Sequence, residues 1–396
     1  LKAYAKSRFG TNSNTVLSAA ALADADGDGN LEVAFGSHDR NVYFVNSNGK
    51  VIWYYNAADT VFSSPAMINV DRNNTFEMII GTDISENEDL RPTTPDGGFL
   101  YAFKTFINST KKKKKNKKRR RKRRSRRKRS TKKQSLNTRY TFRSSTIKKW
   151  RNEKIARDQV IQASPVIADV LPNVAGPEVI IGFGGFFNAG GRRIAIANSK
   201  NGKEIKRLSA PGYTSSEVAV ADLNNDNQLD IVGYFNGSDV NGQSTVIAWD
   251  PRTEQELWRV VPESNGSNDE LAGTIHQSAV IADLDGNGSH EVIVANNKAL
   301  VIINGSDGEV LQTVGLGGRA RTVRSTPTIA DIDQDGKLDV VIGISRLSDG
   351  AVAVAFSGFD SSGDLALNSP DGIHPAYSAP WPMHRGNNRR DGVYRD

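Results

Sequence analysis

Short acidic loops recur along the chain, and their side chains are of the type that binds hard metal ions. The first loop reads Asp24-Ala-Asp26-Gly-Asp28-Gly-Asn30-Leu-Glu32, with acidic residues at its first, third, fifth and ninth positions. Carboxylates at alternate positions of a tight loop face one centre, the glycines permit the turn, and the backbone carbonyl of Asn30 faces the same centre. Oxygen donors in this number suit Ca²⁺, whereas a helix-flanked calcium loop needs a Glu at position twelve.

The same ligand pattern returns in three later loops, so the sequence predicts four calcium sites. In each loop the seventh residue contributes its backbone carbonyl. The predicted ligands are Asp222, Asn224, Asp226, Gln228 and Asp230; Asp283, Asp285, Asn287, Ser289 and Glu291; and Asp331, Asp333, Asp335, Lys337 and Asp339. The Asp222 loop is the weakest version, because it contains one neutral side chain among its ligands and no glycine.

Two further loops have lost the pattern. In the loop from Asn69 to Glu77, two of the five ligand positions are acidic and Arg72 lies inside the loop. The loop from Asp169 to Glu178 is one residue longer and has Leu171 at its third position. We predict no calcium at either loop.

The loops lie inside a longer repeat, in which an apolar run precedes each loop and a β-branched run follows it. The first residues of the six loops are about 45 to 60 residues apart once a basic insertion is discounted, which is the length of a four-stranded propeller blade. Asn-Gly and Asp-Gly dipeptides supply hairpin turns further along each repeat. The pattern predicts an all-β fold, a β-propeller of four-stranded blades; the alternative is an antiparallel sandwich, which needs no period.

The repeats predict a single propeller over residues 1–396. The six clear repeats lie near residues 18–57, 62–104, 163–208, 216–262, 277–315 and 325–360. The stretch from Leu1 to Lys6 resembles a third strand, and the chain after Phe356 can complete the same blade from the other end. We therefore expect seven blades closed by the termini, with a missing N-terminal blade as the alternative.

One strongly basic segment lies between the second repeat and the third. Residues 111–133 contain nineteen Lys or Arg and no acid, and subtracting them from the formal net charge of +8 leaves −11 for the rest. Like charges at this density repel, so we predict a disordered insertion over residues 105–150. Three interpretations stay open: a solvated segment without function, a contact for polyanions such as nucleic acid, anionic polysaccharide or acidic lipid, and a nuclear targeting signal.

Several classes of function are not favoured by the sequence. The chain has no Cys, which excludes disulfides and thiolate chemistry, and it has no apolar run long enough to span a membrane. No leader precedes Leu1 in this chain. The five His, none at metal-binding spacing, are His38, His276, His290, His374 and His384. Cleavage of acidic polysaccharides by a lyase-like mechanism remains the enzymatic alternative.

The acidic loops and the strand ends that follow them, such as Ala34-Phe35-Gly36 and Val341-Ile342-Gly343, resemble the FG-GAP and VCBS repeats of integrin α propellers and bacterial surface proteins. The resemblance covers about residues 18–360 apart from the insertion. It implies a seven-bladed propeller with Ca²⁺ in loops on one face, a protein or glycan ligand, and a location outside the cell or at its surface. The implied function is adhesion or binding.

A second resemblance, to quinoprotein-type propeller repeats, is limited to outer hairpins such as residues 248–258. The Trp of these hairpins is present at Trp53 and Trp258 but is replaced by Lys206 and Gln312. We interpret these Trp side chains as hydrophobic plugs between blades. The alternative is a cofactor cage.

Overall fold

The described residues form strands and no helix. The structure, a computed structural model, describes residues 15–57, 60–73, 75–83, 97–106, 147–157, 159–184, 193–212, 214, 216–235, 244–262, 277–296, 299–316, 320–323, 325–346, 350–357 and 359. They contain twenty-four β-strands in six four-stranded antiparallel sheets, which we number as blades 1 to 6 along the chain. No helix in this part of the chain is long and apolar enough to cross a membrane.

The twenty-four strands fall into six blades. Blade 1 contains β1 (Ala21–Ala23), β2 (Glu32–Gly36), β3 (Asn41–Val45) and β4 (Val51–Asn56), and blade 2 contains β5 (Ala66–Ile68), β6 (Glu77–Gly81), β7 (Gly97–Lys104) and β8 (Lys148–Arg157). Blade 3 contains β9 (Val166–Ala168), β10 (Glu178–Phe183), β11 (Arg193–Asn198) and β12 (Glu204–Ser209), and blade 4 contains β13 (Ala219–Ala221), β14 (Asp230–Phe235), β15 (Thr245–Asp250) and β16 (Gln255–Val260). Blade 5 contains β17 (Val280–Ala282), β18 (Glu291–Ala295), β19 (Ala299–Asn304) and β20 (Val310–Gly315), and blade 6 contains β21 (Ala320–Val323), β22 (Thr328–Ala330), β23 (Asp339–Arg346) and β24 (Gly350–Phe356).

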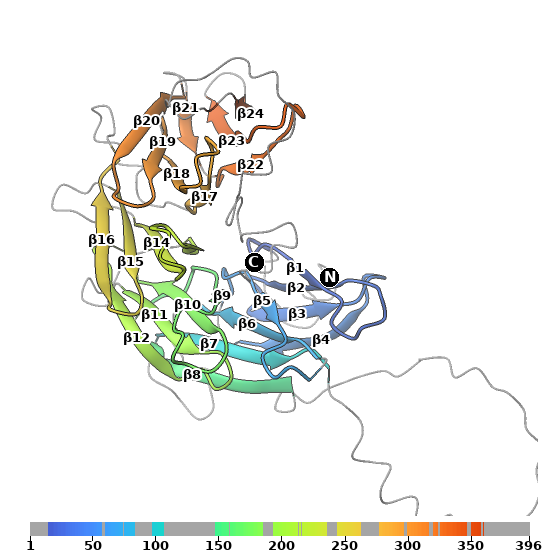
Figure 1. The fold of residues 1–396 in the computed structure, drawn as a ribbon. Coiled ribbons are helices and arrows are strands. Elements are labelled where there is room, and N and C mark those ends of the chain that lie inside the picture. The colour runs from blue at the N-terminus through green and yellow to red at the C-terminus, as the bar shows by residue number, and fades with distance from the viewer. Residues whose placement is uncertain are drawn as a thin grey trace, which may run out of the picture.

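The sheets pack face to face around an arc, with blade 1 and blade 6 at its two ends (Figure 1). The short first strands lie toward the inside of the arc, and consecutive ones such as β1, β5 and β9 are in contact. Separate hydrophobic clusters join blade 1 to blade 2, blade 2 to blade 3, blades 3 to 5, and blade 5 to blade 6. Each intermediate sheet is therefore covered on both faces, which confirms the β-propeller and not the sandwich.

Burial explains the composition of the strands. Every residue of β10 and β14 is buried, and both strands are rich in β-branched and aromatic residues. The outer strand β16 is mostly exposed, with Trp258 and Val260 as its buried residues. Central strands therefore read as continuous apolar runs, whereas the outer strands alternate.

Tryptophan side chains on outer strands connect blade 1 to blade 2, blade 2 to blade 3 and blade 4 to blade 5. Trp53 donates its indole N–H to the Thr105 carbonyl at 3.0 Å, and Trp258 donates to the Gly305 carbonyl at 2.6 Å. Trp150 on β8 makes the same bond to Ser199 at 3.0 Å. All three are at least nine-tenths buried, so the prediction that Trp53 and Trp258 are plugs between blades is confirmed.

The fourth strand of blade 2 differs from the prediction for the basic segment. Strand β8 starts at Lys148 and pairs with β7, from Gly97 opposite Arg157 to Phe103 opposite Lys148. The insertion therefore belongs between β7 and β8 of one blade rather than between two blades, and its last predicted residues are part of β8. Residues 107–146, which include the basic run, lie outside the described residues.

Blade 6 has a different strand order from the other blades. Strand β23 pairs with β22 and β21 along one edge and with β24 along the other, whereas the other five sheets follow the order first to fourth strand. The seventh blade predicted from the termini falls on residues 1–14 and 360–396, which lie outside the described residues.

Candidate metal centre

Each acidic loop connects a short strand to the next strand of its blade, the first and second strands in blades 1 to 5 and β22 and β23 in blade 6. The last residue of the short strand pairs with the ninth residue of the loop, as Ala23 does with Glu32 and Ala330 with Asp339. The same register occurs in blades 2, 4 and 5, and in blade 3 at Glu178. The sheet therefore fixes both ends of every loop in the same way.

Two left-handed residues give the four intact loops their turn. They occupy positions four and six, with φ values of 76° at Gly27 and 88° at Gly29 in the first loop. In the fourth loop Asn225 and Asn227 adopt 59° and 62° at the same positions. Asn tolerates this region better than other residues with a Cβ, which explains how a loop without glycine keeps the turn.

The first residue of each intact loop accepts hydrogen bonds from the loop backbone. Asp24 accepts from the N–H of Asp28 and of Gly29, each at 3.0 Å. The same pair of bonds recurs at Asp222, Asp283 and Asp331. These bonds orient the carboxylate of the first loop residue.

The acidic residue that ends the loop, the ninth residue or, in the longer third loop, the tenth, is buried in all six loops, with exposures between 0% and 3%. One of its carboxylate oxygens accepts a hydrogen bond from the N–H of the second loop residue, at 2.9 Å for Ala25 to Glu32 and 2.8 Å for Ile332 to Asp339. The other oxygen of Glu77 contacts Lys149. In Glu178, Asp230 and Asp339 the second oxygen is buried and has no hydrogen-bond partner.

Three loops bring acidic side chains together. The first, third and ninth residues each place a carboxylate oxygen within 4.8 Å of the others; the groups are Asp24, Asp26 and Glu32; Asp283, Asp285 and Glu291; and Asp331, Asp333 and Asp339. They are loops 1, 5 and 6, three of the four predicted sites. The fifth residues Asp28, Asn287 and Asp335 are outside these groups and accept hydrogen bonds from the N–H of residue seven.

Burial and like charge raise the pKa values of these acids. The pKa of Glu32 is raised to about 6 and that of Glu291 to about 8, first because burial penalises the carboxylate and then because neighbouring Asp residues repel it. The pKa values of Asp26, Asp285 and Asp339 are raised for the same reasons. A cation among these oxygens would favour their charged form, so the residues present fit a hard metal ion.

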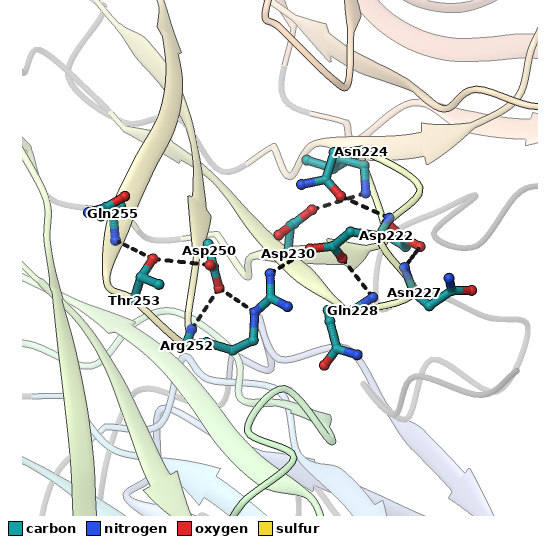
Figure 2. Close-up of polar contacts among 11 residues, drawn as sticks. Asp222, Asn224, Asn227, Gln228, Asp230, Asp250, Arg252, Thr253 and Gln255 are labelled. Atoms are coloured by element: carbon teal, nitrogen blue, oxygen red, sulfur yellow. Dashed lines mark hydrogen bonds and ion pairs between the residues drawn. The ribbon is translucent and has the colours of Figure 1, made fainter.

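A cationic side chain from another part of blade 4 contacts the fourth loop. The guanidinium of Arg252, in the turn between β15 and β16, donates to Asp226 at 2.7 Å and to Asp250 at 2.8 Å (Figure 2). The backbone hydrogen bonds of the other intact loops are also present here: Asp222 and Asn224 accept from loop N–H groups, and the N–H of Gln228 donates to Asp226. The pKa of Asp230 is raised to about 7, mainly by burial. The sequence gives no local signal for Arg252, because it is 26 residues from Asp226.

The seventh residues were predicted to offer carbonyl ligands. The N–H groups of Asn30, Gln228, Ser289 and Lys337 each donate to the fifth side chain of their own loop. This bond fixes the peptide next to the carbonyl. The ligand role of the four carbonyls stays a prediction.

The two loops predicted to lack calcium differ from the others in their side chains. Leu171, at position three of the third loop, is 5% exposed and belongs to the hydrophobic cluster of blades 3 to 5. Glu178 accepts from the N–H of Val170 and of Leu171, at 3.0 and 3.1 Å. Among the described residues, neither this loop nor the Asn69 loop forms a group of three acids.

Solved structures resemble the chain at low identity. BamB from Moraxella catarrhalis is 13% identical with a TM-score of 0.46, and the match covers 86% of this chain and 75% of that one. The V. cholerae biofilm matrix protein Bap1 is 11% identical with a TM-score of 0.44, covering 95% and 82%. The Dos1 propeller is 13% identical with a TM-score of 0.46, covering 92% and 71%.

Sequence comparison gives one family. The chain has no match among curated proteins. The family model described as FG-GAP-like repeat matches residues 275–342, a range that contains the acidic loops of blades 5 and 6. Loops 1, 2 and 4 share the frame of these two loops, on the same pair of strands in their own blades. The repeats of blades 5 and 6 are therefore FG-GAP-like, in a chain that folds as a β-propeller.

Proposed function

We propose that this chain is a calcium-stabilised binding propeller that works outside the cell or at the cell surface. The observation that carries the proposal is the acidic group that recurs in loops 1, 5 and 6, with three carboxylate oxygens within 4.8 Å of one another. Two like charges repel by about 1 kcal/mol at 4 Å even in water. A bound cation removes this repulsion and so stabilises the folded blade.

The donor atoms favour calcium over other ions. Each group consists of carboxylates, with neither His nor Cys, and such hard oxygen donors select Ca²⁺ or Mg²⁺ over transition metals. In loop 1 the ion would be held by Asp24, Asp26 and Glu32, with Asp28 and the Asn30 carbonyl completing the set. Calcium accepts many oxygen ligands in irregular geometry, whereas Mg²⁺ requires near-octahedral geometry, and a nine-residue loop with several carboxylates suits the former.

A cofactor cage of the quinoprotein type is not supported by how the Trp side chains are used. Trp53, Trp150 and Trp258 are buried between blades, where each indole donates to a backbone carbonyl. These side chains are then occupied in packing and are not a cage for a cofactor. The ligand we propose is a protein or a glycan, and the basic run at residues 111–133 is proposed as an additional contact for polyanions.

The proposed location follows from calcium availability. Extracellular calcium modules bind with dissociation constants of roughly 0.1–1 mM, so their sites fill outside the cell and not in the cytosol. We therefore place the protein outside the cell or at the cell surface.

Isothermal titration of chelator-treated protein with Ca²⁺, together with melting curves, tests the metal assignment. We expect three filled sites, or four if the Asp222 loop also binds, and a melting temperature that rises with Ca²⁺ concentration. Equal concentrations of Mg²⁺ are the control and should give a smaller rise. Unchanged melting in millimolar Ca²⁺ and in chelator would overturn the calcium assignment.

A second experiment tests the binding role. The protein is offered to arrayed glycans and matrix proteins in calcium buffer, and its activity is assayed on uronic-acid polymers in parallel. Calcium-dependent retention on one class of ligand without turnover of the polymers is the expected result. Turnover would replace the binding role by the lyase-like alternative.

A further inference from the structure

A lysine side chain enters the acidic loop of blade 2. The ammonium of Lys149 lies 2.7 Å from Asp71 and 3.2 Å from Glu77, which are the third and ninth residues of the loop. The Lys149 side chain is 12% exposed, that of Glu77 is 1% exposed and that of Asp71 is 37% exposed, so the contact with Glu77 is shielded from water and the contact with Asp71 is partly exposed. The charge that faces these carboxylates therefore comes from the protein itself.

Asp71 and Glu77 are at the same loop positions as Asp26 and Glu32, two of the predicted ligands in loop 1. Glu77 pairs with Ile68 as Glu32 pairs with Ala23, and it accepts a hydrogen bond from the N–H of Val70 at 3.0 Å as Glu32 does from Ala25 at 2.9 Å. Asp71 likewise corresponds to Asp26 at position three. Lys149 thus contacts the positions whose carboxylates converge in loops 1, 5 and 6.

The fold brings Lys149 to the loop through a bulge. In the pairing of β7 with β8, Ala102 is opposite Trp150 and Phe103 is opposite Lys148, so Lys149 is the extra residue between them. The other blades with this outer hairpin have a bulge at the same place. Their extra residues are all apolar: Ile52, Ile205, Leu257 and Leu311. A cation at this position is specific to blade 2, and bulges commonly redirect one side chain.

The charges in this loop match a monovalent cation better than a divalent one. Positions one and five, acidic in loop 1, are Asn69 and Asn73 here, and Asn69 still accepts from the N–H of Asn73 at 3.1 Å. Two carboxylates remain, and one ammonium donates to both. The pKa of Glu77 is raised by burial, and the Lys149 charge opposes that rise.

We propose that Lys149 is the built-in cation of blade 2: its ammonium takes the place that a metal ion would have between Asp71 and Glu77, so that this blade is stable without metal. The comparison with loops 1, 5 and 6 rests on the proposed function. The pairing of Lys149 with two loop acids does not, and it is tested in chelator, where no metal takes part.

The test compares Lys149→Leu with Lys154→Leu in EDTA. Leucine is the residue at the equivalent bulge of blades 4 and 5, so the substitution removes the charge and keeps a side chain that this position accepts. Lys154 is an exposed residue of the same strand and serves as the control. We expect Lys149→Leu to lower the melting temperature by at least about 3 °C relative to the control and to increase amide exchange in residues 66–81.

A third variant separates charge from packing. In Lys149→Leu combined with Glu77→Gln, the buried carboxylate that loses its partner is also gone, so the melting temperature should recover most of the loss. If Lys149→Leu alone does not fold and the double variant does, the proposal is supported in the same way. A Lys149→Leu protein as stable as the Lys154→Leu control, or a double variant no more stable than Lys149→Leu, would overturn it.

Discussion

Across the boundary between blades 3 and 4, the Lys206 ammonium lies 3.1 Å from the carboxylate of Glu254 and also donates to the Arg252 carbonyl at 2.5 Å. Trp150 and Trp258 have the equivalent place on the outer strands of blades 2 and 4, and they pack on Gly202 and Gly308 of the next blade. Glu254 has a φ of 64°, like the 70° of Gly202 and the 80° of Gly308. A Lys and Glu pair therefore replaces a Trp and Gly pair at one blade boundary.

Packing explains why the two members of each pair change together. A Cβ on Gly202 would lie 2.4 Å from Cε3 of Trp150, which is too close for any residue but glycine. At the boundary with Lys206, which has a thin flexible side chain, a residue with a Cβ fits, and Glu254 adds a charge partner. The boundary keeps its hydrogen bond to the next blade with a different donor.

We predict that Gly202→Ala destabilises the protein by about 2–4 kcal/mol, through the clash with Trp150 and the strain of a left-handed residue. Gly49→Ala is the matched control, because Gly49 has a φ of 75° in the corresponding turn of blade 1 and a Cβ there would meet nothing within 4 Å. Urea unfolding of both variants gives the difference. Equal losses in the two would mean that the contact with Trp150 contributes nothing.

Much of the architecture was predictable from the repeat. The β-branched run after each loop and the acidic residue that ends the loop mark the strand that follows it in every blade, and the structure places Glu32, Glu178 and Asp339 at the first residue of such strands. Local signals suffice here because the first strand, loop and second strand are continuous in sequence.

The missed features depend on contacts between distant residues. Lys149 and Trp150 fall within the predicted insertion of residues 105–150, although Trp150 matches the placement of Trp53 and Trp258 on their outer strands. Lys149 is 78 residues from Asp71, so no loop motif contains it. The sequence drew attention to Arg72 inside the loop, whereas the cation at the acids is Lys149.

Single substitutions should show how much each loop contributes to the calcium-induced rise in melting temperature. A ligand that binds the folded state alone adds about 2.7 kcal/mol per site at a hundredfold excess over Kd. Asp26→Ala, Asp285→Ala and Asp333→Ala should each remove part of the calcium-induced rise in melting temperature, because each removes the third residue of an acidic group.

The control for this series is Asp71→Ala, the same position in blade 2. Asp71 pairs with Lys149, so its loss should lower stability equally with and without calcium and leave the calcium-induced rise intact. Differential scanning calorimetry at several Ca²⁺ concentrations measures both quantities. A smaller calcium response in Asp71→Ala would place a calcium ion in blade 2.

Arg252 should limit what calcium does in the fourth loop. Its guanidinium neutralises Asp226, one of the predicted ligands, and both side chains are partly exposed. We expect Arg252→Gln to lower stability in chelator by about 1 kcal/mol or less and to increase the stabilisation by calcium. Arg259→Gln, which breaks an exposed pair with Glu256 on the same hairpin, should lower stability without changing the calcium response.

The raised pKa values predict that stability without metal falls as pH rises. The pKa of Glu291 is raised from 4.5 to about 8 and that of Asp230 from 3.8 to about 7, mainly by burial and further by nearby carboxylates. Between these limits the folded state holds protons that the unfolded state has lost. The free energy of unfolding should therefore decrease from about pH 4.5 to about pH 8 in chelator and level off above that.

Saturating calcium should flatten most of this pH dependence, because the bound ion keeps the loop acids ionised in the folded state. Glu178 has a pKa raised from 4.5 to about 7 in a loop that we predict to be free of calcium, so its share of the slope should persist in calcium. Glu178→Gln should remove that share and leave the calcium-sensitive part unchanged. Urea unfolding at pH 5, 6, 7 and 8, with calcium and with chelator, measures both parts, and equal slopes in the two buffers would contradict metal binding at the buried acids.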